Sequence, residues 1–166
     1  AGGARVWHPD AGAAKITTAL ASPADYFEMT FTAQAGTPYR LWLRGRAEND
    51  SWANDSVYVQ FDNSVDTGGA AIWRIATNSS TEVNLEPCTG CGLSGWGWQD
   101  NGYGTNVMGP LIYFAQTGQQ RLRIQVREDG VAIDQIVLSA ARYLTSRPGL
   151  TKDDTTRGFL LDGYPR

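Results

Sequence analysis

Apolar residues at every second position are the feature of this sequence that most restricts its fold. Leu122, Ile124 and Val126 alternate with arginine and glutamine. The same pattern occurs in three further segments, at 27–32, 39–44 and 57–61. Successive side chains of a β-strand point to opposite faces, so each segment predicts a strand with one buried and one solvated face. Such strands are typical of antiparallel sheets.

Turn-forming residues separate these segments and set the architecture. Glycine, proline and aspartate cluster between them, and the chain holds 19 glycines in 166 residues. We expect further strands at 72–76, 82–85, 111–114 and 131–138, with a helix over 135–144 as the competing interpretation of the last one. We therefore predict an all-β fold, an antiparallel β-sandwich or jelly roll over residues 1–147. Residues 148–166 are expected to form a C-terminal tail, either on the surface or docked as an added strand.

Charge and hydropathy exclude some partners. The formal net charge is −3, whereas a nucleic-acid-binding face has to be basic. No apolar run approaches the roughly 18 residues of a membrane span. Six tryptophans and many small polar residues favour a secreted or cell-surface protein.

Two cysteines form a single Cys-x-x-Cys motif. Cys88 and Cys91 are too few for a structural zinc site, which needs about four ligands, and the only histidine, His8, is distant in sequence. The glycines that follow make the helix of a redox motif improbable. The two cysteines are expected to form a short-loop disulfide, or to remain two thiols in a surface loop; a disulfide fits an exported protein.

The segment 94–104 is the strongest candidate for a binding site. It places Trp96, Trp98 and Tyr103 among glycines, with Asn101 beside them. Aromatic rings cover the apolar C–H face of a sugar, and side-chain amides exchange hydrogen bonds with its hydroxyls. This composition predicts a carbohydrate-binding loop. Alternatively, the two tryptophans plug the open end of the sandwich.

A second polar loop, at 48–56, contains Trp52 among acids and amides, and Trp52 and Asp129 are supporting candidates for contact with the sugar. The oxygens of this loop could hold calcium, or they could form Asx turns. Asp134 has the same strand parity as Ile136 and is expected to point inward, where its carboxylate needs a cation, hydrogen-bond donors or a metal. Arg127 is one candidate partner, for Asp134 or for Asp55.

Signals for catalysis are weak. A Ser-His-Asp arrangement would depend on a single histidine near one end of the chain. No phosphate-binding glycine loop is present, and no acid pair can be placed at glycosidase spacing from the sequence. We expect a protein that is not an enzyme, although an enzyme acting on glycans remains an alternative.

Several short motifs occur in a characteristic order: Gly-Gly-Ala-Arg-Val at 2–6, Tyr-Arg-Leu-Trp-Leu-Arg at 39–44, Asn-Asp-Ser-Val-Tyr-Val-Gln at 54–60, Trp-Gly-Trp at 96–98, and Arg-Glu-Asp-Gly-Val-Ala-Ile-Asp-Gln-Ile at 127–136. This order resembles bacterial β-sandwich carbohydrate-binding modules of the galactose-binding-like type, similar to families six and thirty-five. The resemblance spans about residues 1–140. It implies a non-catalytic module that binds a polysaccharide or glycan, usually attached to an exported protein.

The resemblance also implies roles for particular residues. Trp96 and Trp98 correspond to the aromatic loop of such modules. Glu128 and Asp129 fall in a loop that supplies polar contacts to the sugar. Asp134 matches an acidic residue that often helps to hold a structural calcium ion.

The sequence departs from that family at its beginning. Related modules start with a strand carrying Glu-Ala-Glu, whose acids complete the calcium site, whereas this sequence starts at the following Gly-Gly. A sandwich without that strand exposes an edge and a groove. One hypothesis is that residues 151–164 fill the gap, in their own chain or in a neighbour. The second version would make the protein a secreted structural or filament subunit assembled by strand exchange.

Overall fold

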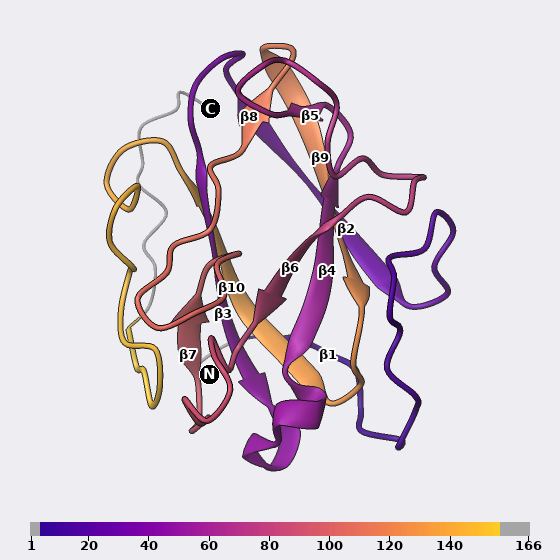
Figure 1. Ribbon diagram of the computed structural model, residues 1–166, viewed down its shortest axis with the longest axis vertical. Helices are drawn as coiled ribbons and strands as arrows, with labels where there is room; N and C mark the ends of the chain where they lie inside the picture. The colour runs from indigo at the N-terminus through magenta and orange to yellow at the C-terminus, as the bar shows by residue number, and fades with distance from the viewer. Residues whose placement is uncertain (1–3, 157–166) are drawn as a thin grey trace.

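Two antiparallel sheets of four strands each, stacked face to face, form this protein. The computed structural model describes residues 4–156. Figure 1 shows β3 and β10 in one layer and β4 and β9 in the other. The predicted all-β antiparallel sandwich is confirmed. In the described part of the chain, no helix is long and apolar enough to cross a membrane.

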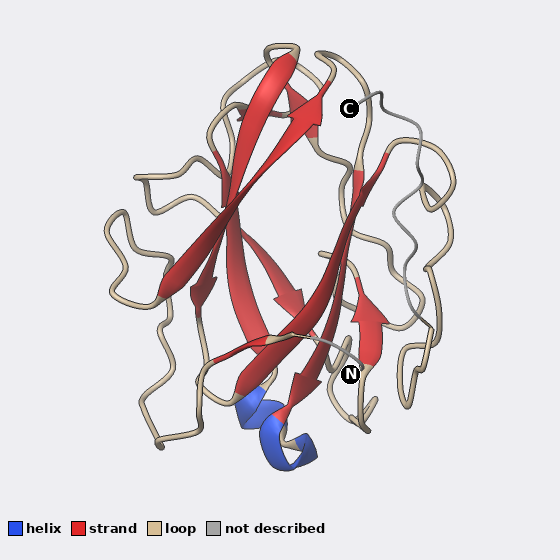
Figure 2. Ribbon diagram, turned by 180° about the vertical axis from the view of Figure 1, so that it is seen from behind, coloured by secondary structure: helices blue, strands red, loops and turns tan. Residues whose placement is uncertain are grey.

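The strand order places sequence-distant segments side by side. Sheet A has the order β1, β10, β3, β7, with the bounds Val6–Trp7, Val131–Ser139, Arg40–Ala47 and Gly97–Gln99. Sheet B has the order β2, β9, β4, β6, with the bounds Tyr26–Ala33, Gly118–Val126, Ser56–Phe61 and Thr81–Asn84. A short pair, β5 (Ser64–Val65) and β8 (Tyr113–Phe114), closes one end. The 3₁₀ turns η1 (Glu48–Asp50) and η2 (Trp52–Asn54) lie together at the other end (Figure 2).

The core consists of the inward positions of both sheets, as the alternation predicted. Leu41 and Leu43 of β3 face Val59, Leu122 and Ile124 of sheet B. At one end of the core four aromatic rings pack edge to face, with centroids 5.4 to 6.5 Å apart: Phe31, Tyr39, Phe61 and Phe114. Edge-to-face packing brings the positive rim of one ring onto the negative face of the next.

Two local predictions are wrong for identifiable backbone reasons. Residues 72–76 do not form a strand, because Trp73 and Ala76 have positive φ values of 48° and 66°. Residues 97–99, expected in a loop, form β7 at the edge of sheet A. The glycine that suggested a loop serves a close approach instead: a Cβ on Gly97 would lie 1.8 Å from the carbonyl oxygen of Thr151.

The outer face of β3 is buried, although alternation predicted a solvated face. The Arg40 guanidinium lies 3.2 Å from the Asp100 carboxylate and donates to the carbonyl of Leu144. The Trp42 indole donates to the carbonyl of Tyr143 at 2.8 Å. The chain that follows β10 therefore covers this face and is held there by the polar ends of the side chains that β3 projects outward.

The C-terminal segment continues across sheet A and packs beside β7. Trp98 donates its backbone N–H to Leu150, and Asp154 donates to Trp96, at 2.9 and 2.7 Å. These contacts dock residues 148–156 on their own chain, without a regular strand. Residues 157–166 lie outside the described part of the chain. Of the segment 151–164 in the strand-exchange hypothesis, the structure therefore describes only residues 151–156.

Asp154 is the residue that fixes this segment. Its Oδ2 accepts a hydrogen bond from the Trp98 indole at 3.0 Å and lies 3.5 Å from the Arg44 guanidinium. Its Oδ1 accepts from the backbone N–H of Leu150 at 2.8 Å. Both Asp154 and Arg44 are buried. Since an unpaired buried charge is costly, removing one partner destabilises the fold strongly.

We predict that Asp154→Ala lowers the free energy of unfolding by about 3 to 5 kcal/mol, because Arg44 loses the nearer of its two acidic partners and the Trp98 indole loses its acceptor. Asp154→Asn is the matched control and should cost less, since its amide oxygen still accepts from the indole. Urea titration followed by tryptophan fluorescence measures both. An alanine variant as stable as wild type would show that Asp154 does not hold the segment.

Candidate functional site

The outer face of sheet B carries the candidate site. Tyr58 on β4 and Asn84 on β6 point outward there. Residues 10–20 cross part of this face, since the Tyr58 hydroxyl donates to the carbonyl of Ile16 at 2.9 Å. The face stays open between this crossing segment and the loops around the disulfide.

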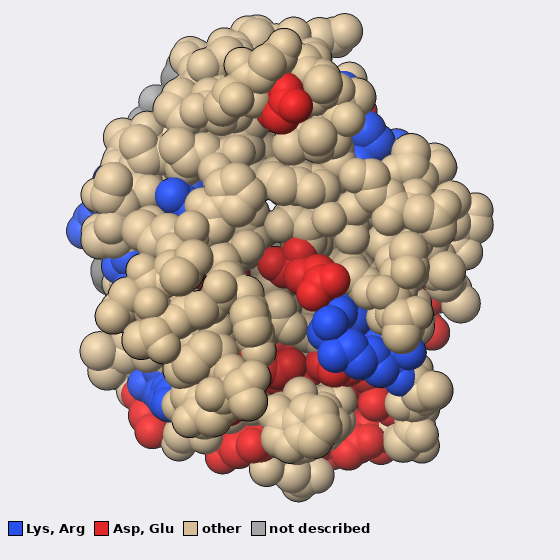
Figure 3. Space-filling model, in the orientation of Figure 1, with Lys and Arg blue, Asp and Glu red and all other residues tan. Residues whose placement is uncertain are grey.

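An open groove lies at this place and joins two neighbouring cavities of about 450 and 380 Å³. Lys15, Asn84 and Tyr103 border both cavities. We call this surface the aromatic groove; its remaining lining residues are Trp52, Asp55, Glu82, Glu86, Thr89, Gly90, Asn101, Arg127 and Glu128. Figure 3 shows acidic and basic side chains gathered around a hollow over β4 and β6.

Two exposed aromatic rings border the groove. Trp52, on η2, is 71% exposed, and Tyr103, in the loop after β7, is 57% exposed. The Ser51 hydroxyl accepts the backbone N–H of Ala53 and so caps the turn that carries Trp52. The 48–56 loop therefore consists of two 3₁₀ turns, of which the second is capped by Ser51, and the described residues hold no group of acids that supports the calcium interpretation.

A disulfide fixes one wall of the groove. Cys88 and Cys91 are bonded, with their Cα atoms 5.3 Å apart, as one of the two predictions expected. The backbone N–H of Gly104 donates to the carbonyl of Pro87, and that of Gly92 donates to the Glu86 carboxylate, at 2.6 and 2.7 Å. These bonds tie the disulfide loop to the loop that carries Tyr103.

Two carboxyl groups share a hydrogen bond at the base of the groove. Asp55 precedes β4 and Glu128 follows β9, and the pairing of these strands brings them together. Desolvation by burial raises the pKa of Asp55 to about 7, and the neighbouring Glu128 adds to the rise. Burial also opposes ionisation of Glu128, but hydrogen bonds from Lys15 and Ser56 outweigh it, so its pKa is lowered. The pair therefore holds one proton and one negative charge near neutral pH.

The cations of the groove are paired with acids. Lys15 Nζ lies 2.8 Å from Glu128, and Arg127 lies 3.3 Å from Glu82. Arg127 also donates to the Ser56 hydroxyl at 2.6 Å. Its acidic partners are thus Glu82 and Glu128, rather than Asp55 or Asp134.

Of the predicted aromatic pair, Trp98 is not available for ligand binding, and Trp96 lies outside the aromatic groove. Trp98 is fully buried beneath the C-terminal segment, with its indole N–H bonded to Asp154. Trp96 is partly buried, and the Arg44 guanidinium lies 5.6 Å from its ring centroid. Assigning Trp98 to a sugar site was wrong, because its large apolar surface is used in packing. The alternative interpretation, that the tryptophans close the sandwich, fits Trp98.

Asn101 and Asp129 are both engaged within the fold. The Asn101 amide donates to the Thr81 hydroxyl and to the carbonyl of Pro110, so it borders the groove with its N–H donors already used. Asp129 is buried and accepts the backbone N–H groups of Ala13 and Ala11, which hold its pKa below the usual value. Asp129 therefore supports residues 10–13, and its assignment as a sugar contact is wrong.

Asp134 points to the outer face of sheet A rather than into the core. The register between β10 and β3 shifts at a β-bulge between Ile133 and Gln135, where two residue steps of β10 lie opposite one residue step of β3. Ile133 therefore takes the inward position. Asp134 lies 3.8 Å from the Arg44 guanidinium, and desolvation raises its pKa while Arg44 opposes the rise. The guanidinium occupies the cation's place, and no metal-binding group of acids, histidines or cysteines occurs among residues 4–156. These residues do not fit the calcium ion that the resemblance implied.

Several groove residues escaped sequence analysis. Lys15, Asn84 and Glu86 lie in unrelated segments and converge only through strand pairing. Asp55 and Glu128 flank two alternating strands, which was a usable signal for their meeting once the pairing of those strands was known. Of the predicted sugar contacts and loop residues, Trp52, Asn101, Tyr103 and Glu128 are brought to one groove.

Comparison with family models, characterised proteins and solved structures gave no match for this chain. No residue role is therefore transferred from a relative. The candidate site rests on the geometry of its own residues.

We predict that Asp55→Asn flattens the dependence of stability on pH between about pH 5 and 7. Folded Asp55 keeps its proton up to about pH 7, whereas the unfolded chain releases it near its usual value of 3.8, so wild-type stability falls as pH rises through this window. Each pH unit of that difference is worth about 1.4 kcal/mol. Urea titrations at pH 5, 6, 7 and 8 measure the two curves.

Asp134, whose pKa is also raised, should leave part of this slope in the Asp55 variant. The stability of the Asp55 variant should exceed that of wild type by the largest margin at pH 8. Parallel curves for the two proteins would contradict the shared-proton arrangement of Asp55 and Glu128.

Proposed function

We propose that this protein is a non-catalytic carbohydrate-binding module and that the aromatic groove holds the sugar. One observation carries the proposal: Trp52 and Tyr103, two strongly exposed aromatic side chains, border the same groove. Exposed large aromatics are costly unless a partner covers them, and a pyranose ring presents a C–H face that an aromatic ring can cover.

The polar lining supplies the second half of sugar recognition. The Asn84 amide, the Thr89 hydroxyl and the Glu86 carboxylate border the same groove as the two rings. Amides and hydroxyls both donate and accept hydrogen bonds, and carboxylates accept them, so together they match the hydroxyl rim of a sugar. The disulfide loop and the capped turn fix both walls before binding, which lowers the entropic cost of association.

The charge of the groove favours a neutral glycan. Glu82, Glu86 and Glu128 lie along it, and its two cations are already paired with acids. A uronic acid would bring a further carboxylate beside these groups. A neutral polysaccharide meets no such repulsion and retains all of the stacking contacts.

The Cys88–Cys91 disulfide supports a secreted or cell-surface location for this function. Disulfides persist in oxidising compartments, which are also where extracellular polysaccharides are encountered. A binding module of this kind would hold an attached exported protein against its glycan. Binding would be reversible, since the contact consists of two rings and a few hydrogen bonds.

We predict that Trp52→Ala and Tyr103→Ala each weaken retention on a neutral polysaccharide about fivefold, because each removes one stacking platform worth about 1 kcal/mol. Trp7→Ala and Tyr26→Ala are matched controls: their side chains are 46% and 49% exposed and lie outside the groove. Affinity electrophoresis over a panel of neutral and uronic-acid polysaccharides measures retention. Far-UV circular dichroism confirms that each variant is folded.

Equal retention of all four variants would overturn the assignment of the groove. Release of new reducing ends or unsaturated products from the same panel would replace binding by catalysis, with Asp55 and Glu128 as the first residues to change. Repeating the panel with a chelator tests the calcium that the family resemblance implied.

We predict that the double variant Cys88→Ser, Cys91→Ser binds the same polysaccharide several-fold more weakly, while its far-UV spectrum is unchanged. Without the disulfide, the wall that carries Thr89 and contacts Tyr103 loses its fixed shape, and binding has to order it. Isothermal titration should show a more unfavourable binding entropy. Unchanged affinity would show that hydrogen bonds alone hold this wall.

A further inference from the structure

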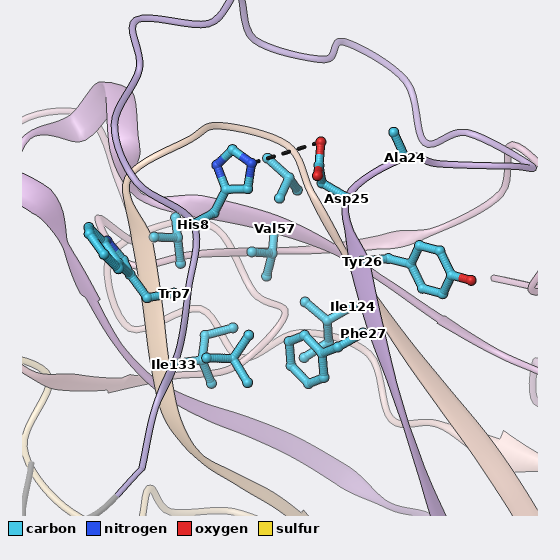
Figure 4. Close-up of a pocket in the computed structure, with 12 residues that line it drawn as sticks. Trp7, His8, Ala24, Asp25, Tyr26, Phe27, Val57, Ile124 and Ile133 are labelled. Atoms are coloured by element: carbon cyan, nitrogen blue, oxygen red, sulfur yellow. Dashed lines mark ion pairs between the residues drawn. The ribbon is translucent and has the colours of Figure 1, made fainter.

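A second cavity opens at the other edge of the sandwich, where β1 and β2 face each other across the two sheets. Its volume is about 210 Å³, and residues of both sheets line it. Figure 4 shows Val57, Phe27, Ile124 and Ile133 directed toward the space between the strands, whereas Trp7 and Tyr26 point away from it. The interior is therefore apolar and continuous with the core.

The cavity exists because the edge of sheet A is short. β1 has only two residues, Val6 and Trp7, whereas β2 on the opposite sheet has eight. Val57, Val131 and Ile133 at this place belong to the core cluster but also line the cavity. Val126, at an inward position of β9, stays only partly buried because it borders the same space.

Two titratable side chains stand at the mouth. His8 follows β1 and Asp25 precedes β2, with His8 Nε2 3.8 Å from an Asp25 oxygen (Figure 4). The backbone of His8 is bonded to Val131 and Gly130, and the carbonyl of Asp25 accepts the N–H of Val126. Both mouth residues are thus held by the sheets, on opposite sides of one opening.

We propose that this cavity is a binding site for a small neutral molecule with an apolar body and one hydroxyl group, of which phenol is the simplest probe. An apolar cavity of roughly 150 Å³ is large enough for a benzene ring, so this volume accommodates a phenol. Its ring would lie among the valine and isoleucine side chains. Its hydroxyl would remain at the mouth, where it can donate to the Asp25 carboxylate.

The mouth also determines which molecules are excluded. A carboxylate in place of the hydroxyl would lie beside the like charge of Asp25, which disfavours it. The expected order of affinity is therefore phenol above benzoate, two probes with one ring each.

The full chain is titrated with these two probes and followed by amide chemical shifts in two-dimensional NMR. Phenol should bind with a Kd of about 1 mM or below, and its shifts should centre on His8, Asp25, Val126 and Val131. Val126→Phe, which fills the cavity from a partly buried position, should weaken phenol binding at least tenfold. Tyr103→Ala is the control and should leave phenol binding unchanged.

Three results would overturn this site: no saturable phenol binding, shifts scattered over the surface, or equal binding of phenol and benzoate. If Val126→Phe does not fold, the position of the wild-type shifts decides the question. Retention of Val126→Phe on polysaccharide is measured in parallel. Loss of phenol binding with normal polysaccharide retention separates this cavity from the aromatic groove.

Discussion

A set of buried ion pairs on the outer face of sheet A determines how the rest of this molecule is arranged. Arg44 lies between Asp134 and Asp154, and Arg40 lies against Asp100. A buried charge is tolerated only with a partner, so these arginines require that the chain after β10 return across the sheet. Once Asp154 is in place, the Trp98 indole has its hydrogen bond and the face is closed. Arg40 and Arg44 lie four positions apart on β3 and therefore project from the same face of that strand.

Because the outer face of sheet A is covered, ligand binding falls to other parts of the surface. The aromatic residues that looked most suited to a sugar, Trp96 and Trp98, belong to the closed face. Sheet B is covered only in part by residues 10–20, and its open end carries Trp52 and Tyr103. Large flat apolar rings therefore stabilise the fold on the closed face of sheet A, whereas on the side of sheet B they remain free for a ligand.

Both proposed sites lie at an end or an edge of a sheet. They differ in the side chains that are exposed there. At the aromatic groove the ends of β4 and β6 present charged and amide side chains, with exposed rings beside them, which fits a polyhydroxylated ligand. Between β1 and β2 the edges are too short to cover the core, and the lining is aliphatic, which fits an apolar body. Carboxyl groups stand beside both: Asp55 is buried and its pKa is raised, whereas Asp25 is exposed.

The sequence by itself determined the sandwich and most of its strands, and it left the cysteines open between a disulfide and two thiols. Period two in Leu122, Ile124 and Val126 depends only on local geometry, whereas the Cys88–Cys91 bond also needs the turn that brings the two Cα atoms to 5.3 Å. Tertiary structure alone decided that the outer face of β3 is covered, where the bulge placed Asp134, and that Gly97 served a close approach rather than a turn. It also decided that Trp98 is buried while Trp52 is exposed. Local periodicity reports which side of a strand a residue is on, whereas burial depends on segments that return from 50 or more positions away, and no local pattern encodes that return.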